Sequence, residues 1–411
     1  MAEAPARAAS PYTVLDLSRD PNPLAQHYTR FRVAERILLT GHSHQAWPDV
    51  SFEGPLHAWA DAAELVDGKW GRAEAMADRV RAGYARLLGD RPENVALGHN
   101  THELVLRFLS ALPLRERPRL VTTDGEFHSL RRQLDRVAED GFLEIVKVSA
   151  DPSFSIPERL ARAVDRRTAA VLVSSVLFRN AHIVPGLRAV LDACRAAGAE
   201  LLVDAYHHLN VVPFSILEEG LEDAFVTGGG YKYCQLGEGN GFLRVPPSRS
   251  NLRPVLTGWF SEFAKLTHAP GKEVPYGAGP ATWAGATYDP TSHYRAAIVF
   301  DFFQEQGLTP DLLRLVYQHQ VAFLAKRFDA LGLDPMVVTR DRSVGIERLG
   351  GFLSLQTPHA GDFFRALRER GVLTDYRGEW LRLGPAPYLS DAQLEAAMEH
   401  LGEIARTLAS R

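Results

Sequence analysis

Two stretches of the chain, ELLVDAYHH (200–208) and DAFVTGGGYKYCQLGEGNGFLRV (223–245), decide its fold class. Each opens with a short apolar run of the kind that forms a buried strand, and each run leads into residues that carry chemistry. The first run ends at Asp204, and the second continues through three glycines to Lys232. Ligands of parallel sheets bind at the carboxyl ends of the strands, so the pattern predicts that this carboxylate and this amine face one site.

The surrounding sequence extends the same pattern. Apolar runs at 119–123, 142–148 and 169–176 read as further strands, and amphipathic periodicity at 155–167 and 186–199 reads as helices between them. Near-continuous apolar strands separated by helices indicate an α/β fold with a parallel sheet covered on both faces. After about residue 295, two long helical stretches, short strands and a final helix predict a smaller α+β domain.

Composition excludes several classes of protein. The chain has 411 residues, a formal net charge of −4 and an apolar content of 45%. This balance is that of an ordinary globular protein and gives no basic footprint for nucleic acid. The two cysteines, Cys194 and Cys234, indicate a reducing compartment, and no apolar run approaches the length of a membrane span. We expect a cytoplasmic protein with no metal site.

The lysine and the aspartate together indicate one kind of cofactor chemistry. A lysine amine forms a Schiff base with a carbonyl cofactor, and a carboxylate at the end of a buried strand can keep a pyridinium nitrogen protonated. The chain also has an Asp-x-x-His step, Asp204 to His207, and a Tyr-Lys-Tyr step at 231–233, followed by Gly237, Gly239 and Gly241. On these motifs the chain resembles the fold-type I enzymes that use pyridoxal 5′-phosphate (PLP), in the class V aminotransferase branch, and kynureninases in particular.

The resemblance implies an architecture. It implies a large PLP-binding domain with a mostly parallel seven-stranded sheet (46–293) and a smaller α+β C-terminal domain (294–411). The N-terminal segment (1–45) would pack near the small domain and the active site. A homodimer with shared active sites is implied as well.

The resemblance also implies the roles of the central residues. Lys232 would carry PLP, Asp204 would hold the ring nitrogen, and His207 and Tyr231 would lie on the phosphate side. Tyr231 would also transfer protons.

Three further segments provide candidate cofactor contacts. Asn100 and Thr101 precede a helix, where they either cap it or, as the resemblance implies, bind the phosphate. The resemblance implies that an aromatic ring, His128 or Phe127, stacks on the pyridine ring, and we prefer His128. Asn180 either reaches the ring hydroxyl or is a turn residue.

Other candidates concern the substrate and the partner subunit. The resemblance implies that Trp259 and Thr287 contribute to a neighbouring subunit's site and that Ser43 or His44 touches substrate. Arg382 alternates with apolar neighbours in WLRLGP, and its planar fork suits a carboxylate. It resembles the arginine that binds the substrate's α-carboxylate, with Arg377 as the alternative.

The implied activity is hydrolysis of a β–γ carbon–carbon bond in an α-amino acid. Two departures from kynureninases bear on the substrate: Asp289 stands where an asparagine is expected, and the stretch 60–74 has no histidine. A substrate other than L-kynurenine, with a donor group at its far end, is therefore expected. An aminotransferase or a β-elimination/C–S lyase on the same fold stays open, as does a PLP-binding regulator without catalysis.

Overall fold

A seven-stranded sheet forms the centre of the protein. The computed structural model describes residues 10–265 and 271–410. The strands lie in the order β2-β8-β7-β6-β5-β3-β4. Their bounds are β2 (Val95–Gly98), β3 (Arg119–Thr123), β4 (Glu144–Val148), β5 (Thr168–Ser174), β6 (Glu200–Asp204), β7 (Phe225–Gly229) and β8 (Gly241–Arg244). Only β8 among them runs against its neighbours, so the expected mostly parallel sheet is confirmed.

The strands form because both of their faces are covered. All of β5 is buried, and its side chains alternate between two cores: Val171 and Val173 face one, Ala170 and Leu172 the other. Helices pack against each face. These are α4 (Thr101–Ala111) and α5 (His128–Glu139) on the side of Leu172, and α6 (Ile156–Ala163) and α7 (Leu187–Ala197) on the side of Val171.

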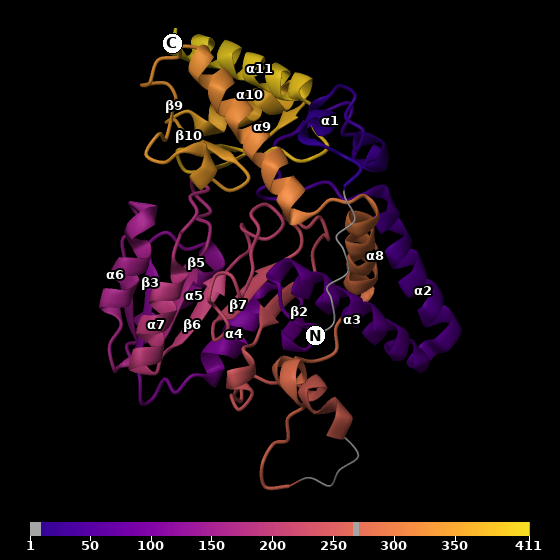
Figure 1. The fold of residues 1–411 in the computed structure, drawn as a ribbon, viewed down its shortest axis with the longest axis vertical. Helices are drawn as coiled ribbons and strands as arrows, with labels where there is room; N and C mark the ends of the chain where they lie inside the picture. The colour runs from indigo at the N-terminus through magenta and orange to yellow at the C-terminus, as the bar shows by residue number, and fades with distance from the viewer. Residues whose placement is uncertain (1–9, 266–270, 411) are drawn as a thin grey trace.

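The C-terminal part is a second α+β unit. An antiparallel sheet has the order β12-β13-β10-β9. Its elements are α9 (Pro310–Ala330), β9 (Thr339–Arg340), β10 (Leu353–Gln356), α10 (Ala360–Glu369), β11 (Val372–Leu373), β12 (Asp375–Arg377), β13 (Trp380–Leu383) and α11 (Asp391–Ala409). Figure 1 shows its helices above the large sheet, at the end of the molecule where α1 also lies.

The N-terminal segment lies against this C-terminal unit. Helix α1 (Val14–Ser18) contacts α9, and β1 (Ile37–Leu38) pairs in parallel with β11. The segment then continues as a bridge between Thr40 and Gly384. Residues 1–9 of the expected N-terminal segment lie outside the described part of the chain. None of the helices in the described ranges combines the length and apolar character that a membrane crossing requires.

Three helices beside the sheet pack closely on one another. Helices α2 (Glu53–Leu65) and α3 (Lys69–Leu88) both contact α8 (Thr291–Glu305), which the sequence assigned largely to the small domain. At the crossing of α2 and α8 the backbones nearly touch. A Cβ atom added to Gly54 would lie 2.5 Å from the Arg295 backbone nitrogen. Glycine at 54 therefore sets how near the two helices approach.

The close helix crossing yields a test. Gly54→Ala should lower the stability of the protein by about 1–3 kcal/mol, because the new methyl group overlaps backbone that cannot rotate away. The matched control is Gly71→Ala in α3, where an added Cβ meets nothing within 4 Å. That change should raise stability by about 0.5–1 kcal/mol through helix propensity. Chemical denaturation of the two variants would measure the difference, and equal midpoints would refute the packing argument.

Candidate active site

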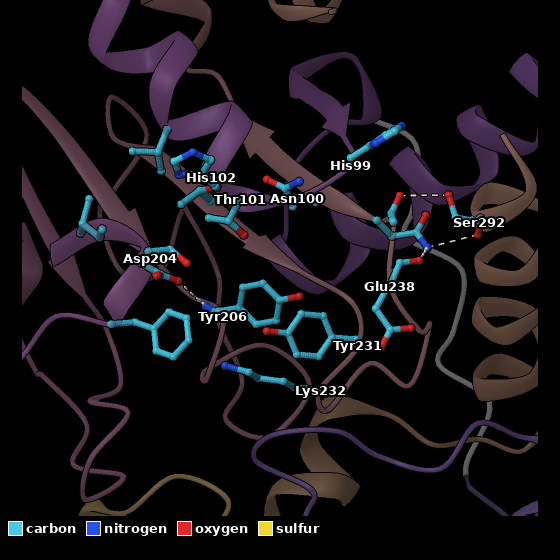
Figure 2. A pocket seen from close by; sticks show the side chains of 18 of the residues that line it. His99, Asn100, Thr101, His102, Asp204, Tyr206, Tyr231, Lys232, Glu238 and Ser292 are labelled. Carbon is cyan, nitrogen blue, oxygen red and sulfur yellow. Dashed lines mark hydrogen bonds between the residues drawn. The ribbon is translucent and has the colours of Figure 1, made fainter. Parts of the chain in front are cut away.

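A cavity of about 720 Å³ lies at the carboxyl-terminal edge of the large sheet. The ends of β6 and β7, the start of α4 and the start of α8 all contribute to its wall. Figure 2 shows Asp204, Tyr206, Tyr231 and Lys232 together on one side, with Asn100 and Thr101 across the cavity. The parallel pairing of β6 with β7 puts the two strand ends at the same edge, as the sequence predicted.

Lys232 is the most enclosed charged group of this cavity. Only 4% of the residue is exposed, and its Nζ lies 2.8 Å from Nε2 of His207. Three aromatic rings surround the amine: their centroids lie 4.6 Å (Tyr206), 5.0 Å (Phe127) and 5.7 Å (Tyr231) from Nζ. Burial lowers the pKa of Lys232 to about 7, although the negative charge of Asp204 opposes the shift. A large fraction of the amine is therefore uncharged at neutral pH.

Asp204 and His207 are tuned by the same burial. Burial raises the pKa of Asp204, opposed by a hydrogen bond that the carboxylate accepts from the Tyr206 backbone N–H at 2.8 Å and by the charge of Lys232. Burial also lowers the pKa of His207 well below its usual range, and the charges of Lys232 and Arg382 add to this effect. A neutral His207 can accept a hydrogen bond from Lys232 and so direct the amine.

The first turn of α4 forms one wall of the cavity. Asn100 lies at the N-cap, where its side-chain oxygen accepts a hydrogen bond from the Glu103 N–H at 3.0 Å. Helix geometry leaves the N–H groups of Thr101 and His102 without acceptors inside the helix. The predicted cap by Asn100 is confirmed, and both Asn100 and Thr101 line the cavity, so phosphate binding at this helix start stays a prediction.

The structure separates the two aromatic candidates on β3–α5. Phe127 lines the cavity, whereas His128 is exposed and starts α5, with its Nδ1 3.3 Å from Arg131 Nη2. We therefore replace the preferred His128 with Phe127 as the ring that faces the cavity.

The residue that sequence reasoning missed is Tyr206. It lines the cavity between Asp204 and Lys232, and its ring centroid lies 5.0 Å from that of Tyr231. Its position two residues after Asp204 was a signal, as was the glycine run at 228–230, which leaves room for a large neighbour. Glu238, in the loop before β8, and Ser292 and Arg295, in the first turns of α8, also line the cavity without having been predicted.

Arg382 is buried, and a carboxylate of the chain already holds it. Its Nε donates to Asp375 Oδ1 at 2.7 Å, its Nη2 also pairs with Asp375, and its Nη1 donates to the Phe178 carbonyl at 2.6 Å. Asp375 is its direct cross-strand neighbour on β12. Burial raises the pKa of Asp375. A hydrogen bond from His42 and the positive charges of Arg382 and Arg377 outweigh this effect and hold the pKa well below its usual range. Arg382 lies outside the set of described residues that line the cavity, but its charge acts on Lys232.

The remaining predicted residues lie in several places. Asp289 lines the cavity, and its carboxylate accepts two hydrogen bonds from Thr291, the first residue of α8. His44 stacks on Tyr231 at 4.8 Å, which brings it to the rim. Ser43 donates to the Thr40 carbonyl, which fits a turn.

The other three predicted residues lie outside the cavity wall. Asn180 is buried and accepts a hydrogen bond from the His182 N–H, as a turn residue does. Trp259 and Thr287 are exposed, and the Trp259 indole Nε1–H donates a hydrogen bond to Thr287 Oγ1 at 3.0 Å.

Removal of the Asp375 charge should destabilise the protein. Asp375→Asn would leave the buried Arg382 guanidinium without its counter-charge, and loss of one partner from a buried ion pair costs about 3 kcal/mol or more. Glu139→Gln is the control, because Glu139 pairs with Arg136 on an exposed helix face and should change stability by no more than the error of measurement. Urea unfolding would compare the two, and similar small effects would show that Arg382 needs no buried partner.

The chain is similar in sequence to several known proteins. The family model described as "Kynureninase C-terminal domain" matches residues 335–401. Kynureninase of Pseudomonas fluorescens is 25% identical over 95% of this chain and 94% of its own length. Isopenicillin N epimerase of Streptomyces clavuligerus is 27% identical over 53% of this chain and 56% of its own length.

Solved structures share the fold at lower identity. A mutant of C-DES with glycine covalently linked to its PLP cofactor superposes with a TM-score of 0.80, at 15% identity, over 93% of this chain and 99% of its own. Cysteine desulfurase from Thermococcus onnurineus NA1 gives a TM-score of 0.78, at 15% identity, over 97% of this chain and 100% of its own. With the sheet, the site motifs and the relatives taken together, the chain is a kynureninase-like protein with the class V aminotransferase fold.

Proposed function

We propose that the protein is a PLP-dependent enzyme that acts on an α-amino acid and, like the kynureninases it resembles, hydrolyses a β–γ carbon–carbon bond. The observation that carries the proposal is Lys232. Its amine is buried, has a pKa lowered to about 7, and shares one cavity with Asp204 and the first turn of α4. Ordinary structural lysines stay charged and solvated, so an enclosed, partly uncharged amine indicates a chemical role.

The residues of the cavity fit PLP part by part. The amide groups of Thr101 and His102 at the start of α4 suit a phosphate. Asp204 suits a protonated ring nitrogen, and the face of Phe127 suits a flat ring. The volume of about 720 Å³ is in the range of small-molecule sites and leaves room for a substrate beside the cofactor.

When bound, PLP supplies an electron sink for a carbanion at the substrate's α-carbon. Lys232 would hold the cofactor, and its amine, when free, would be placed to remove the proton on the substrate's α-carbon. Asp204 would hold a proton at the ring nitrogen. Neutral His207 accepts a hydrogen bond from Lys232 and keeps its amine directed into the cavity. Burial raises the pKa of Tyr231, so its phenol keeps its proton at neutral pH and can act as an acid.

Arg382 would bind the substrate's α-carboxylate. Asp375 and the Phe178 carbonyl accept hydrogen bonds from Nε, Nη2 and Nη1. A guanidinium has five N–H groups, so one N–H on each terminal nitrogen remains for the substrate. Water would then add to the γ-carbonyl carbon, and the β–γ bond would break to give a carboxylic acid and alanine.

A cysteine-based reaction fits the site less well, although a desulfurase shares the fold. The chain has two cysteines, and both are buried. Burial raises the pKa of each thiol, Cys194 and Cys234, to about 12. Neither is a nucleophile at neutral pH, because the thiolate is the reactive form. Elimination or transamination needs no thiol, so these reactions are the remaining competitors on this site.

We also infer that two copies of the chain associate. Val255, Leu256, Trp259 and Phe263 are exposed on the excursion between β8 and α8, which projects from the lower edge of the molecule in Figure 1. Large apolar side chains that are exposed in one chain often mark a surface that another chain covers. In such a dimer, the bonded pair Trp259 and Thr287 would reach the neighbouring subunit's site.

The first test concerns Lys232. Borohydride reduction of the protein with PLP should fix the cofactor to Lys232, and mass spectrometry of the digested protein should find the adduct there. Capture of PLP should slow as the pH falls below about 7, because protonation removes the amine's lone pair. Lys232→Ala should abolish the adduct, whereas Lys326→Ala, on the exposed side of α9, should retain it. A reduced adduct on another lysine would sink the assignment.

The second test concerns the substrate. We expect a kcat/KM on L-kynurenine and 3-hydroxykynurenine below the ordinary enzyme range of ~10⁴ M⁻¹s⁻¹. Partial burial raises the pKa of Asp289, but hydrogen bonds from Thr291 outweigh this effect and hold the pKa below its usual range. Asp289 is therefore ionised, and an ionised carboxylate cannot donate a hydrogen bond to the carbonyl of kynurenine. Glu238 adds a second carboxylate to the same cavity.

The matched variant is Asp289→Asn. The amide keeps an oxygen for Thr291 and gains a donor, so kynurenine turnover should rise in this variant. Amino acids with an amine, hydroxyl or cation at the far end should be better substrates of the unmodified protein, as judged by perturbation of the bound-cofactor spectrum. A value of ~10⁴ M⁻¹s⁻¹ or more on either kynurenine would overturn the selectivity argument and leave the reaction class in place.

A further inference from the structure

We propose that Tyr206 is a cofactor-binding residue, and that its ring, resting on Gly229, forms the second aromatic wall of the slot that starts at Lys232, with Phe127 as the first. The inference rests on the proposed function, because the slot has a purpose only if a flat cofactor is attached to Lys232. It assigns a role to a tyrosine of the cavity wall that the sequence motifs did not single out.

Two contacts, one at the backbone and one at the ring, locate Tyr206 in the cavity. The Tyr206 backbone N–H donates to Asp204 Oδ1 at 2.8 Å, so the residue starts directly at the carboxylate expected to hold the ring nitrogen. Its ring ends beside the amine, with Lys232 Nζ 4.6 Å from the ring centroid. The side chain therefore runs along the cavity from one cofactor-binding group to the other, as Figure 2 shows.

Gly229 is what allows a tyrosine to lie there. A Cβ atom added to Gly229 would lie 2.4 Å from the Tyr206 hydroxyl oxygen and 2.6 Å from two of its ring carbons. The hydroxyl end of the ring therefore lies against the backbone at the end of β7, in the space that a side chain at 229 would otherwise fill. Without this space the ring would have to move toward the cavity.

Two rings approach the amine from different elements. Phe127 precedes α5 and its centroid lies 5.0 Å from Lys232 Nζ, whereas Tyr206 follows β6. A flat ring joined to Nζ would meet both of them. The face of an aromatic ring is electron-rich and attracts a cationic partner, so Tyr206 would favour the protonated ring that Asp204 also favours.

The experiment is a titration of apo-protein with PLP, followed by absorbance and near-ultraviolet circular dichroism of the bound cofactor. Tyr206→Leu removes the ring and keeps a large apolar side chain. It should weaken PLP affinity about ten-fold, the scale of a lost stacking contact, and shift the cofactor spectrum. Tyr206→Phe keeps the ring and should bind PLP within about three-fold of the unmodified protein.

Gly229→Ala supplies the independent test. The new methyl group overlaps the ring of Tyr206 and should push it into the slot, so PLP affinity should fall at least as far as in Tyr206→Leu. The double variant Gly229→Ala/Tyr206→Ala removes the obstructing ring and should bind PLP more tightly than Gly229→Ala alone. Thermal unfolding of each apo-protein would establish that the variants are folded, and Gly71→Ala serves as a glycine change in open space.

The outcomes separate the two proposals. If the unmodified protein does not bind PLP, the proposed function fails. If it binds PLP and Tyr206→Leu leaves both affinity and spectrum unchanged, the second wall is refuted while the proposed function stands. A double variant no better than Gly229→Ala would also overturn the inference, because the effect of Gly229 would then not act through Tyr206.

Discussion

Burial of one lysine amine is the constraint on which the rest of the site depends. An ammonium group taken out of water is costly, and the protein offsets this cost with the Asp204 carboxylate, a neutral His207 acceptor and three ring faces around Nζ. The remaining cost appears as a pKa lowered to about 7. The sheet makes the arrangement possible, because β6 and β7 run in parallel and end at the same edge. The reactivity of Lys232 is thus a consequence of where two adjacent strands stop.

The glycine run before Lys232 is explained by its neighbours. An added Cβ would lie 2.8 Å from the Phe242 ring at Gly228, 2.4 Å from the Tyr206 hydroxyl at Gly229 and 2.5 Å from Leu236 at Gly230. Three large side chains therefore pack directly on backbone. The glycines have no side chains of their own, so these neighbours can pack against the backbone, and one of them, Tyr206, lines the cavity. A solvated flexible loop, the simplest interpretation of three glycines, is excluded because all three are buried.

A second charged cluster connects the two domains. Arg382 and Asp375 belong to the small antiparallel sheet, His42 comes from the N-terminal segment, and the Phe178 carbonyl belongs to the large domain. Burial lowers the pKa of His42 to about 4, so it stays neutral and donates to Asp375. The proposed carboxylate site is therefore held by three segments at once. A change in how the domains pack would alter the orientation of Arg382 and, with it, substrate binding.

Local patterns in the sequence determined much of this protein: five of the parallel strands, Asp204 and Lys232 at or just beyond the ends of two of them, and the helix start at Asn100 all follow from periodicity and residue type. The short strands β2 and β8 were not found, because four residues carry too little periodicity. Tertiary structure alone decided that Phe127 faces the cavity, that Asp375 holds Arg382 and that Tyr206 lies over Gly229. Each of these depends on the direction of a side chain relative to a residue distant in the chain or on another element. Such directions follow from packing, which a single sequence does not display, whereas strand ends follow from local hydrophobicity, which it does.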